Sequence, residues 1–393
     1  MKTIGKLLLV TFVLIFFSCQ RTQTNEIEKI INEVQDEFAP DSRTAIFDIS
    51  YEKSAGKNIL KGETNITQAK MALLKKITDS KISVKDEITI LPSKELGEKI
   101  YGIVNVSVCN IRSKTTNSSE LSTQSLLGHP LRIYKKNDDY YFVQTTDNYL
   151  GWLNKNEFIS MNKAEYKDWQ DSKKIIFLKE FGFSYSKPDV NSMRISDLVM
   201  IDLLKYLGEV DEFTKVEYPD GRQAFVLSSQ CEFFDKWKKE TKPTAENILK
   251  AAYRFLGDPY LWGGTSAKML DCSGLSKTAY FLNGILLPRD ASQQVFIGET
   301  ITENVEEYDK LKPADLVFFG YNKNGKERIT HVGIYIGNGK FIHQPGPVKI
   351  NSFKKSDPDF NPFRYRSFKR GQRILSSINE NGVKLVKDCE FYK

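Results

Sequence analysis

Histidine is scarce in this chain of 393 residues, which has only three: His129, His331 and His343. The five cysteines are scattered and include no CxxC pair, so the sequence predicts neither a zinc site nor a dense disulfide framework. The net charge of +7 is spread over many residues, with no dense block of lysine and arginine. We therefore expect no metal site and no nucleic-acid partner.

Long apolar runs are also missing, apart from residues 7–17, which are too few to cross a bilayer comfortably. Lysines precede this run and Cys19 follows it directly after a small residue, which resembles a bacterial lipoprotein processing site. There the cysteine would be lipidated and become the mature N-terminus, although phenylalanine replaces the usual leucine three positions before it. The alternative is an ordinary secretory signal. Either interpretation makes residues 1–19 a signal peptide of an exported protein, and lipidation predicts a membrane-anchored, periplasmic lipoprotein of the cell envelope.

The length of the chain predicts several domains rather than one core. Within residues 20–98, helical spacing at 26–38 and 67–77 is combined with strand patterns at 44–51 and 82–90. This segment is therefore expected to form a small α+β cap. Nothing in its sequence predicts a chemical function.

Residues 102–160 change to short strands with frequent turns, which is typical of a small β-barrel. The segments 120–124 and 147–153 resemble bacterial SH3-like domains. A later stretch of the chain is weakly similar in sequence to the second segment. This similarity predicts another, diverged SH3-like barrel over residues 170–235. Inside it, residues 195–207 are expected to form an inserted helix.

The last domain is expected over residues 243–373, followed by a C-terminal tail over 374–393. Thr244 is a plausible N-cap for its first helix. Cys272 is expected in the first turn of a second helix, where free backbone N–H groups and the helix dipole favour a thiolate. The same amides are suited to an oxyanion hole.

His331 and His343 belong to one predicted hairpin that turns at Asn338-Gly339. A two-residue loop would put the two histidines on opposite faces of the sheet. A three-residue loop with Gly339 in a left-handed bulge would pair Gly333 with His343 and bring both imidazoles to one face. A catalytic interpretation therefore requires a hairpin loop with an odd number of residues.

These residues stand in four motifs that resemble the NlpC family of bacterial cell-wall cysteine peptidases. In order along the chain, the motifs are Tyr260–Gly264, Asp271–Leu275, Asp315–Phe319 and His331–Gly337. The resemblance covers the last domain and implies a papain-like α+β fold without a metal or organic cofactor. It implies that Cys272 is the nucleophile, His331 the general base and acid, and His343 the residue that orients the imidazole. Asp271 and Ser273 would contact the substrate.

A narrower resemblance concerns SH3-like domains placed ahead of such a peptidase domain. This architecture is similar to γ-D-glutamyl-L-diamino-acid endopeptidases that recognise a free N-terminal L-alanine on the peptidoglycan stem peptide. The positions that match their ammonium-binding residues are Glu120, Tyr149 and Asp290. Two carboxylates and a phenol around a cation form a charge-assisted site that an internal residue could not satisfy.

The sequence therefore predicts a monomeric, lipid-anchored, multidomain α+β thiol peptidase that hydrolyses free muropeptides through a thioester on Cys272. Two alternatives stay open: a peptidase acting on intact crosslinked murein, and a non-catalytic cell-wall-binding lipoprotein that keeps the fold. His129 is expected in an exposed loop, Trp262 in the packing of the cleft wall, and Arg364 on a solvated basic surface. A disulfide among the cysteines other than Cys19 and Cys272 also stays open.

Overall fold

The computed structural model describes residues 24–54 and 56–392. The predicted signal peptide, including the predicted lipidation site Cys19, lies outside these residues. The chain divides into two compact units, one ending at Gly97 and the other beginning at Glu98. Among the described residues, no helix has the length and apolar character needed to cross a membrane.

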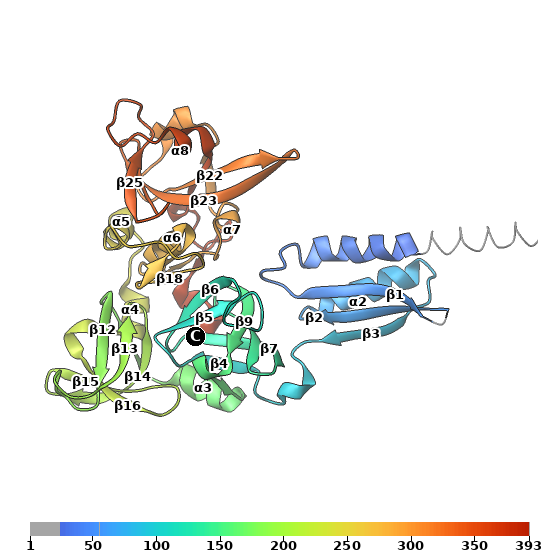
Figure 1. Ribbon diagram of the computed structural model, residues 1–393, viewed down its shortest axis with the longest axis horizontal. Helices are drawn as coiled ribbons and strands as arrows, with labels where there is room; N and C mark the ends of the chain where they lie inside the picture. The colour runs from blue at the N-terminus through green and yellow to red at the C-terminus, as the bar shows by residue number, and fades with distance from the viewer. Residues whose placement is uncertain (1–23, 55, 393) are drawn as a thin grey trace, which may run out of the picture. The chain divides into compact units, whose positions relative to one another are not determined.

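The N-terminal unit is a small α+β fold, as the sequence predicts (Figure 1). Its sheet has the order β1-β2-β3, with β1 antiparallel and β3 parallel to β2. A parallel pair needs a crossover connection, which α2 supplies. A helix over residues 24–38 buries Ile27 and Val34 in the same core as Leu73 of α2. The named elements are β1 (Phe47–Ser54), β2 (Lys57–Thr64), α2 (Thr67–Asp79) and β3 (Lys85–Ile90).

The second unit begins with an antiparallel seven-stranded β-domain in the order β10-β4-β7-β8-β9-β5-β6. Cys109 is fully buried in β5. Helix α3 (Lys163–Asp171) follows and is capped at its N-terminus by Asn162, which forms a capping box with Glu165. The strands are β4 (Tyr101–Val104), β5 (Val108–Arg112), β6 (Leu121–Leu126), β7 (Pro130–Asn137), β8 (Tyr140–Gln144), β9 (Leu150–Asn154) and β10 (Phe158–Met161).

A second antiparallel seven-stranded β-domain follows, in the order β13-β12-β16-β15-β14-β11-β17. The helix expected over residues 195–207 is wrong, because two strands with a tight turn occupy this segment. The fully buried carboxylate of Asp202 accepts the backbone N–H groups of Val199 and Leu127, and Ile201 adopts a positive φ of 81°. The strands are β11 (Lys174–Phe177), β12 (Phe181–Tyr185), β13 (Arg194–Val199), β14 (Leu203–Val210), β15 (Phe213–Glu217), β16 (Gln223–Leu227) and β17 (Cys231–Phe233).

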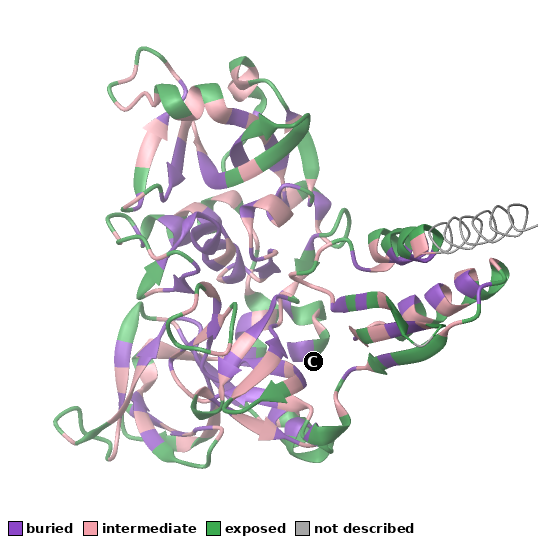
Figure 2. Ribbon diagram, turned by 45° about the vertical axis from the view of Figure 1, so that its right-hand side comes forward, coloured by how far each residue is buried: buried purple, intermediate pink, exposed green. Residues whose placement is uncertain are grey.

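The last part of the chain forms an antiparallel sheet in the order β21-β26-β22-β23-β24-β25. Helix α6 packs against β23, and α5 packs against α6. Figure 2 shows that buried residues gather along α6 and inside the two β-domains. The larger elements are α4 (Phe234–Glu240), α5 (Ala245–Tyr253), α6 (Cys272–Phe281), β21 (Glu299–Thr302), β22 (Leu316–Lys323), β23 (Lys326–Gly337), β24 (Lys340–His343), β25 (Lys349–Ser352), α8 (Pro362–Ser367) and β26 (Phe368–Arg373). Shorter ones are β18 (Thr265–Ser266), β19 (Met269–Leu270), β20 (Ile285–Leu286), α7 (Ala291–Gln294) and β27 (Lys384–Leu385).

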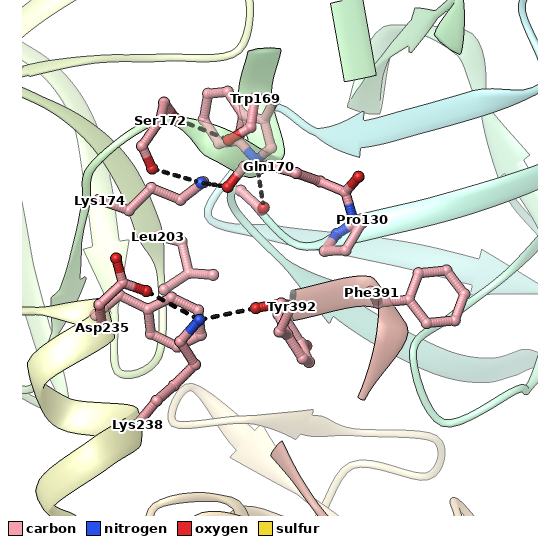
Figure 3. A pocket seen from close by; sticks show the side chains of 12 residues that line it. Pro130, Trp169, Gln170, Ser172, Lys174, Leu203, Asp235, Lys238, Phe391 and Tyr392 are labelled. Carbon is pink, nitrogen blue, oxygen red and sulfur yellow. Dashed lines mark hydrogen bonds and ion pairs between the residues drawn. The ribbon is translucent and has the colours of Figure 1, made fainter. Parts of the chain in front are cut away.

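The C-terminal tail is an integral part of this unit. Its strand β27 pairs with β20, and Phe391 and Tyr392 are buried. In Figure 3, Lys238 of α4 lies between the carboxylate of Asp235 and the backbone carbonyl of Tyr392, at 2.9 Å and 2.8 Å.

The same tail explains why the prediction of an exposed His129 is wrong. The imidazole is buried, with Nδ1 2.7 Å from the hydroxyl of Tyr392 and Nε2 2.9 Å from the carbonyl of Ile201. A carbonyl can only accept, so Nε2–H donates to Ile201 and Nδ1 accepts from Tyr392. Burial lowers the pKa of His129 to about 4. One histidine therefore joins the first β-domain to the second and to the C-terminus.

Candidate active site

Cys272 is the first residue of α6, as predicted, and its side chain is buried. The preceding residue, Asp271, caps the helix by accepting the backbone N–H of Gly274 at 2.7 Å. Burial, together with the negative charge of Asp271, raises the pKa of the Cys272 thiol to about 12, although backbone hydrogen bonds from Val332 and Ser273 act in the opposite direction. The expected stabilisation of a thiolate is therefore outweighed in this structure. A thiol whose pKa is raised needs a base to become a nucleophile.

The hairpin places His331 and His343 on one face of the sheet. Gly333 pairs with His343 as predicted, and His331 Nε2 lies 2.8 Å from His343 Nδ1. The predicted three-residue loop is wrong, because Lys340 pairs with Gly337 and the turn contains only two residues. The odd residue is instead a bulge in β23 between Tyr335 and Gly337.

Both imidazoles are neutral at pH 7. Burial lowers the pKa of His331 well below its ordinary value, with the positive charge of Arg364 and the neighbouring His343 adding to the effect. Burial also lowers the pKa of His343 to about 3. General-base catalysis by an imidazole starts from its neutral form, which has a lone pair to accept the proton of a thiol.

Arg289 is a buried residue of this site to which the sequence interpretation gave no role. Its guanidinium is 1% exposed and binds the Asp271 carboxylate with two nitrogens, at 2.6 Å and 3.2 Å. It also donates to Ser273 Oγ at 2.9 Å and to Thr123 Oγ1 of the first β-domain at 3.0 Å. The only signal in the sequence that pointed to Arg289 was its position directly before Asp290. Burial of the guanidinium depends on carboxylates and hydroxyls that meet only in the folded chain.

Asp271 and Ser273 flank Cys272, but both are engaged within the protein. Each oxygen of Asp271 accepts hydrogen bonds from protein donors, including Gly263 N–H, Gly274 N–H and both terminal nitrogens of Arg289. Ser273 Oγ donates to Asp271 and accepts from Arg289. These contacts fix the start of α6. A substrate contact for either residue stays a prediction.

The structure brings Tyr149 and Asp290 together. The Tyr149 hydroxyl donates to Asp290 Oδ2 at 3.0 Å, and Asp290 N-caps α7, where Gln293 completes a capping box. Tyr149 is buried, whereas Asp290 is half-buried. A residue of the first β-domain thus reaches the segment that directly follows Arg289.

Glu120 reaches the other side of the same region. Its exposed carboxylate accepts the indole N–H of Trp262 at 2.8 Å, and the next residue, Gly263, donates its backbone N–H to Asp271 at 3.0 Å. Trp262 is 62% exposed, so the prediction that it packs in the cleft wall is wrong. Glu120 and Tyr149 thus each bond to a residue whose sequence neighbour, Gly263 or Arg289, binds Asp271 at the N-terminus of α6.

The first β-domain is held firmly at this site. Thr265 donates its backbone N–H to Gln124 Oε1 and its hydroxyl to the Gln124 carbonyl, both at 3.0 Å. Lys277 of α6 forms an ion pair with Asp147 at 2.6 Å, and both side chains are largely buried. These contacts flank Glu120 and Tyr149 in the sequence and fix their positions relative to Cys272.

Comparison with known proteins agrees with this geometry. Residues 257–363 match the NlpC/P60 family, and residues 111–158 match the bacterial dipeptidyl-peptidase Sh3 domain. The chain carries an NlpC/P60 domain and a bacterial SH3 domain. The NlpC/P60 match contains Cys272, His331 and His343, and the SH3 match contains Glu120 and Tyr149.

Two curated relatives carry the name gamma-D-glutamyl-L-lysine dipeptidyl-peptidase. The protein from Bacillus cereus is 29% identical over 58% of this chain and 69% of its own length. The protein from Bacillus subtilis is 32% identical over 50% of this chain and 60% of its own length. A crystal structure of an NlpC/P60 family protein from Bacillus cereus covers 70% of this chain and 99% of its own, with a TM-score of 0.59 at 23% identity. This structural likeness supports the multidomain fold.

Three further observations complete the description of the NlpC/P60 domain and its neighbours. Arg364 is half-buried 5.3 Å from the ring of Phe319, so the prediction of a fully solvated side chain is wrong. Cys109, Cys231 and Cys272 are free thiols. No cluster of metal-ligating side chains occurs among residues 24–54 and 56–392.

Proposed function

We propose that this protein is a cysteine endopeptidase that hydrolyses the γ-D-glutamyl–L-diamino-acid bond of peptidoglycan stem peptides with a free N-terminal L-alanine. The observation that carries the proposal is the hydrogen bond between Tyr149 of the SH3 domain and Asp290 of the NlpC/P60 domain. The names of the two Bacillus relatives support the choice of bond.

The chemistry of the three recognition residues suits an ammonium group. Tyr149 donates its hydroxyl proton to Asp290, and a phenol oxygen is also able to accept a hydrogen bond from a substrate N–H. Asp290 and Glu120 each contribute a carboxylate. An amide nitrogen inside a longer peptide has one proton and no charge, so it could bond to only one of these acceptors and would not neutralise the carboxylates. This difference would confine the enzyme to the end of a stem peptide.

Hydrolysis would proceed in two acyl-transfer steps. Cys272 Sγ attacks the carbonyl carbon of the D-glutamyl γ-carboxyl group while its proton passes to His331. The C–N bond then breaks as His331 returns the proton to the departing amine of the diamino acid, which leaves a thioester. In the second step, a water molecule gives a proton to His331 and attacks the thioester, and the released thiolate regains a proton. Backbone N–H groups at the start of α6 would stabilise the negative oxygen in both steps.

The test uses stem peptides that begin with L-Ala-γ-D-Glu followed by L-lysine or diaminopimelate, with the N-terminus either free or acetylated. Mass spectrometry of the products is expected to show rapid release of L-Ala-D-Glu from the free peptides and only slow release from the acetylated ones. Cys272→Ala should abolish turnover, and cleavage that survives this change would overturn the mechanism.

The same experiment separates the two alternative functions. Equal cleavage of acetylated peptides and of intact murein sacculi would favour an endopeptidase that acts on crosslinked material. Tight binding to sacculi without turnover of any peptide would favour a non-catalytic binding protein.

We also propose that Cys19 is lipidated and holds the exported protein, as a monomer, at the cell envelope. The apolar run before Cys19 and the small residue next to it support this proposal. Metabolic labelling with an alkyne fatty acid should mark the wild-type chain and not Cys19→Ser. Labelling of both proteins would contradict lipidation at this residue.

A further inference from the structure

A third side chain lies beyond the two histidines. Asn351 belongs to β25 and pairs with Phe341, two residues before His343 in β24, so Asn351 and His343 share a face of the sheet. Asn351 Oδ1 lies 2.8 Å from His343 Nε2. The other ring nitrogen of His343 bonds to His331, so both nitrogens of the ring form hydrogen bonds.

Hydrogen bonds to the backbone determine how the side-chain amides of Asn351 and Asn361 are oriented. Asn361 N-caps α8, where its Oδ1 accepts the backbone N–H of Arg364 at 3.0 Å. Its amide nitrogen must therefore be the atom that donates to Asn351 Oδ1 at 3.0 Å. Asn351 Nδ2 donates to the Asp359 carbonyl at 3.1 Å, and a carbonyl can only accept. Both asparagines consequently have a single allowed orientation.

This orientation determines the tautomers of both imidazoles. Because Asn351 presents an oxygen, the neutral His343 must carry its proton on Nε2, which leaves Nδ1 as an acceptor. His331 must then carry its proton on Nε2 to donate across the 2.8 Å contact. The remaining lone pair of His331 is on Nδ1, the only ring nitrogen left to take a proton from the thiol.

We propose that Asn351, oriented by Asn361 at the N-terminus of α8, is a positioning residue that sets the tautomers of His343 and His331 and so keeps His331 ready to act as the base. The inference rests on the proposed function for its kinetic consequence. The tautomers themselves are a property of the folded protein and can be measured without a substrate.

Three substitutions test the proposal. Asn351→Leu removes the acceptor at similar volume and should lower kcat about a hundredfold with little change in KM, since positioning acts on the chemical step. Asn361→Asp keeps an oxygen to cap α8 but cannot donate, so the new carboxylate would oppose Asn351 Oδ1 and should lower kcat about tenfold. Arg366→Ala, an exposed change on the same helix, is the matched control and should leave kcat unchanged.

The second readout is the ¹⁵N spectrum of the full chain labelled at its three histidines, because bare and protonated ring nitrogens have well-separated shifts. Wild-type protein should show Nε2–H for His331 and His343, and Asn361→Asp should give mixed tautomers in both rings. A wild-type His343 protonated on Nδ1 would overturn the proposal, even if Asn351→Leu does not fold.

Unchanged kcat and unchanged spectra in both asparagine variants would overturn it equally. A wild-type protein that cleaves no stem peptide would instead contradict the proposed function, while the spectra would still decide the tautomers.

Discussion

The phenolic hydroxyl of Tyr149 donates a hydrogen bond to Asp290 Oδ2 over 3.0 Å and thereby joins residues 141 positions apart in the chain. Tyr149 belongs to the SH3 domain, and Asp290 directly follows Arg289, which binds the N-cap residue of α6. The SH3 domain therefore contributes a side chain to the region around Cys272. Under the proposed function, this contact would allow the SH3 domain to take part in selecting the substrate.

Tyr149→Phe should reduce kcat/KM for peptides with a free N-terminus and leave the slow cleavage of acetylated peptides unchanged. A hydrogen bond to a charged group contributes about 1.5–3 kcal/mol, which corresponds to roughly a 10- to 100-fold loss. The measurement is the ratio of kcat/KM for the free and acetylated peptide. Tyr140→Phe is the matched control, because the Tyr140 hydroxyl bonds to the exposed Asn117 in the same domain. An equal fall for both substrates would contradict a role in amine recognition.

Arg289→Met should destabilise the protein by about 3–5 kcal/mol, because it leaves the buried carboxylate of Asp271 without its charged partner. Urea denaturation would measure the change. Arg254→Met removes a more exposed ion pair with Glu180 and should cost less than about 1 kcal/mol. Comparable losses of unfolding free energy from the two substitutions would show that the buried ion pair contributes no more to stability than the exposed one.

Lys277→Met should cost about 3 kcal/mol of unfolding free energy, since Asp147 is 1% exposed and would lose its 2.6 Å ion pair. Although burial acts in the opposite direction, Lys277 and the Thr145 hydroxyl hold the pKa of Asp147 below its ordinary value. Lys236→Met removes only solvent-exposed helix pairs and should change stability by less than about 0.5 kcal/mol. If the Lys277 substitution costs no more than the Lys236 substitution, the pair does not fasten the SH3 domain to α6.

Stability should fall as the pH decreases from about 6.5 towards 4, and His129 should account for a defined part of this loss. The unfolded chain protonates this imidazole below its ordinary pKa of 6.5, whereas the folded chain resists protonation until about pH 4. The stabilisation is therefore complete above pH 6.5 and is lost as the pH falls through this window. At pH 5, protonation of His129 in the unfolded chain has lowered the free energy of unfolding by about 2 kcal/mol.

His129→Gln isolates that contribution. The amide can still donate to the Ile201 carbonyl and accept from Tyr392, but it does not titrate. Denaturation at pH 7.5 and pH 5.0 should show a loss that is about 2 kcal/mol smaller in the variant than in the wild type. Equal losses would mean that His129 titrates normally in the folded state.

Much of the fold followed from local patterns. Thr244 caps α5 and Asp271 caps α6 where the sequence predicted helix starts, because a capping side chain acts within three residues. The segment over residues 195–207 was misread because its apolar spacing also fits a helix. What turns it into two strands is the buried carboxylate of Asp202, which binds the N–H of Leu127 in another domain. No pattern within the segment contains that contact.

The sequence by itself determined that Cys272 lies at a helix start and that Gly333 pairs with His343, because these features depend on local spacing. The tertiary structure decided how the odd residue is accommodated, since a bulge between Tyr335 and Gly337 replaces the expected longer loop. It also decided that Arg289 is buried and that Asn351 meets His343. Those contacts join side chains from separate elements, and their energies depend on distance and burial that only the folded chain creates.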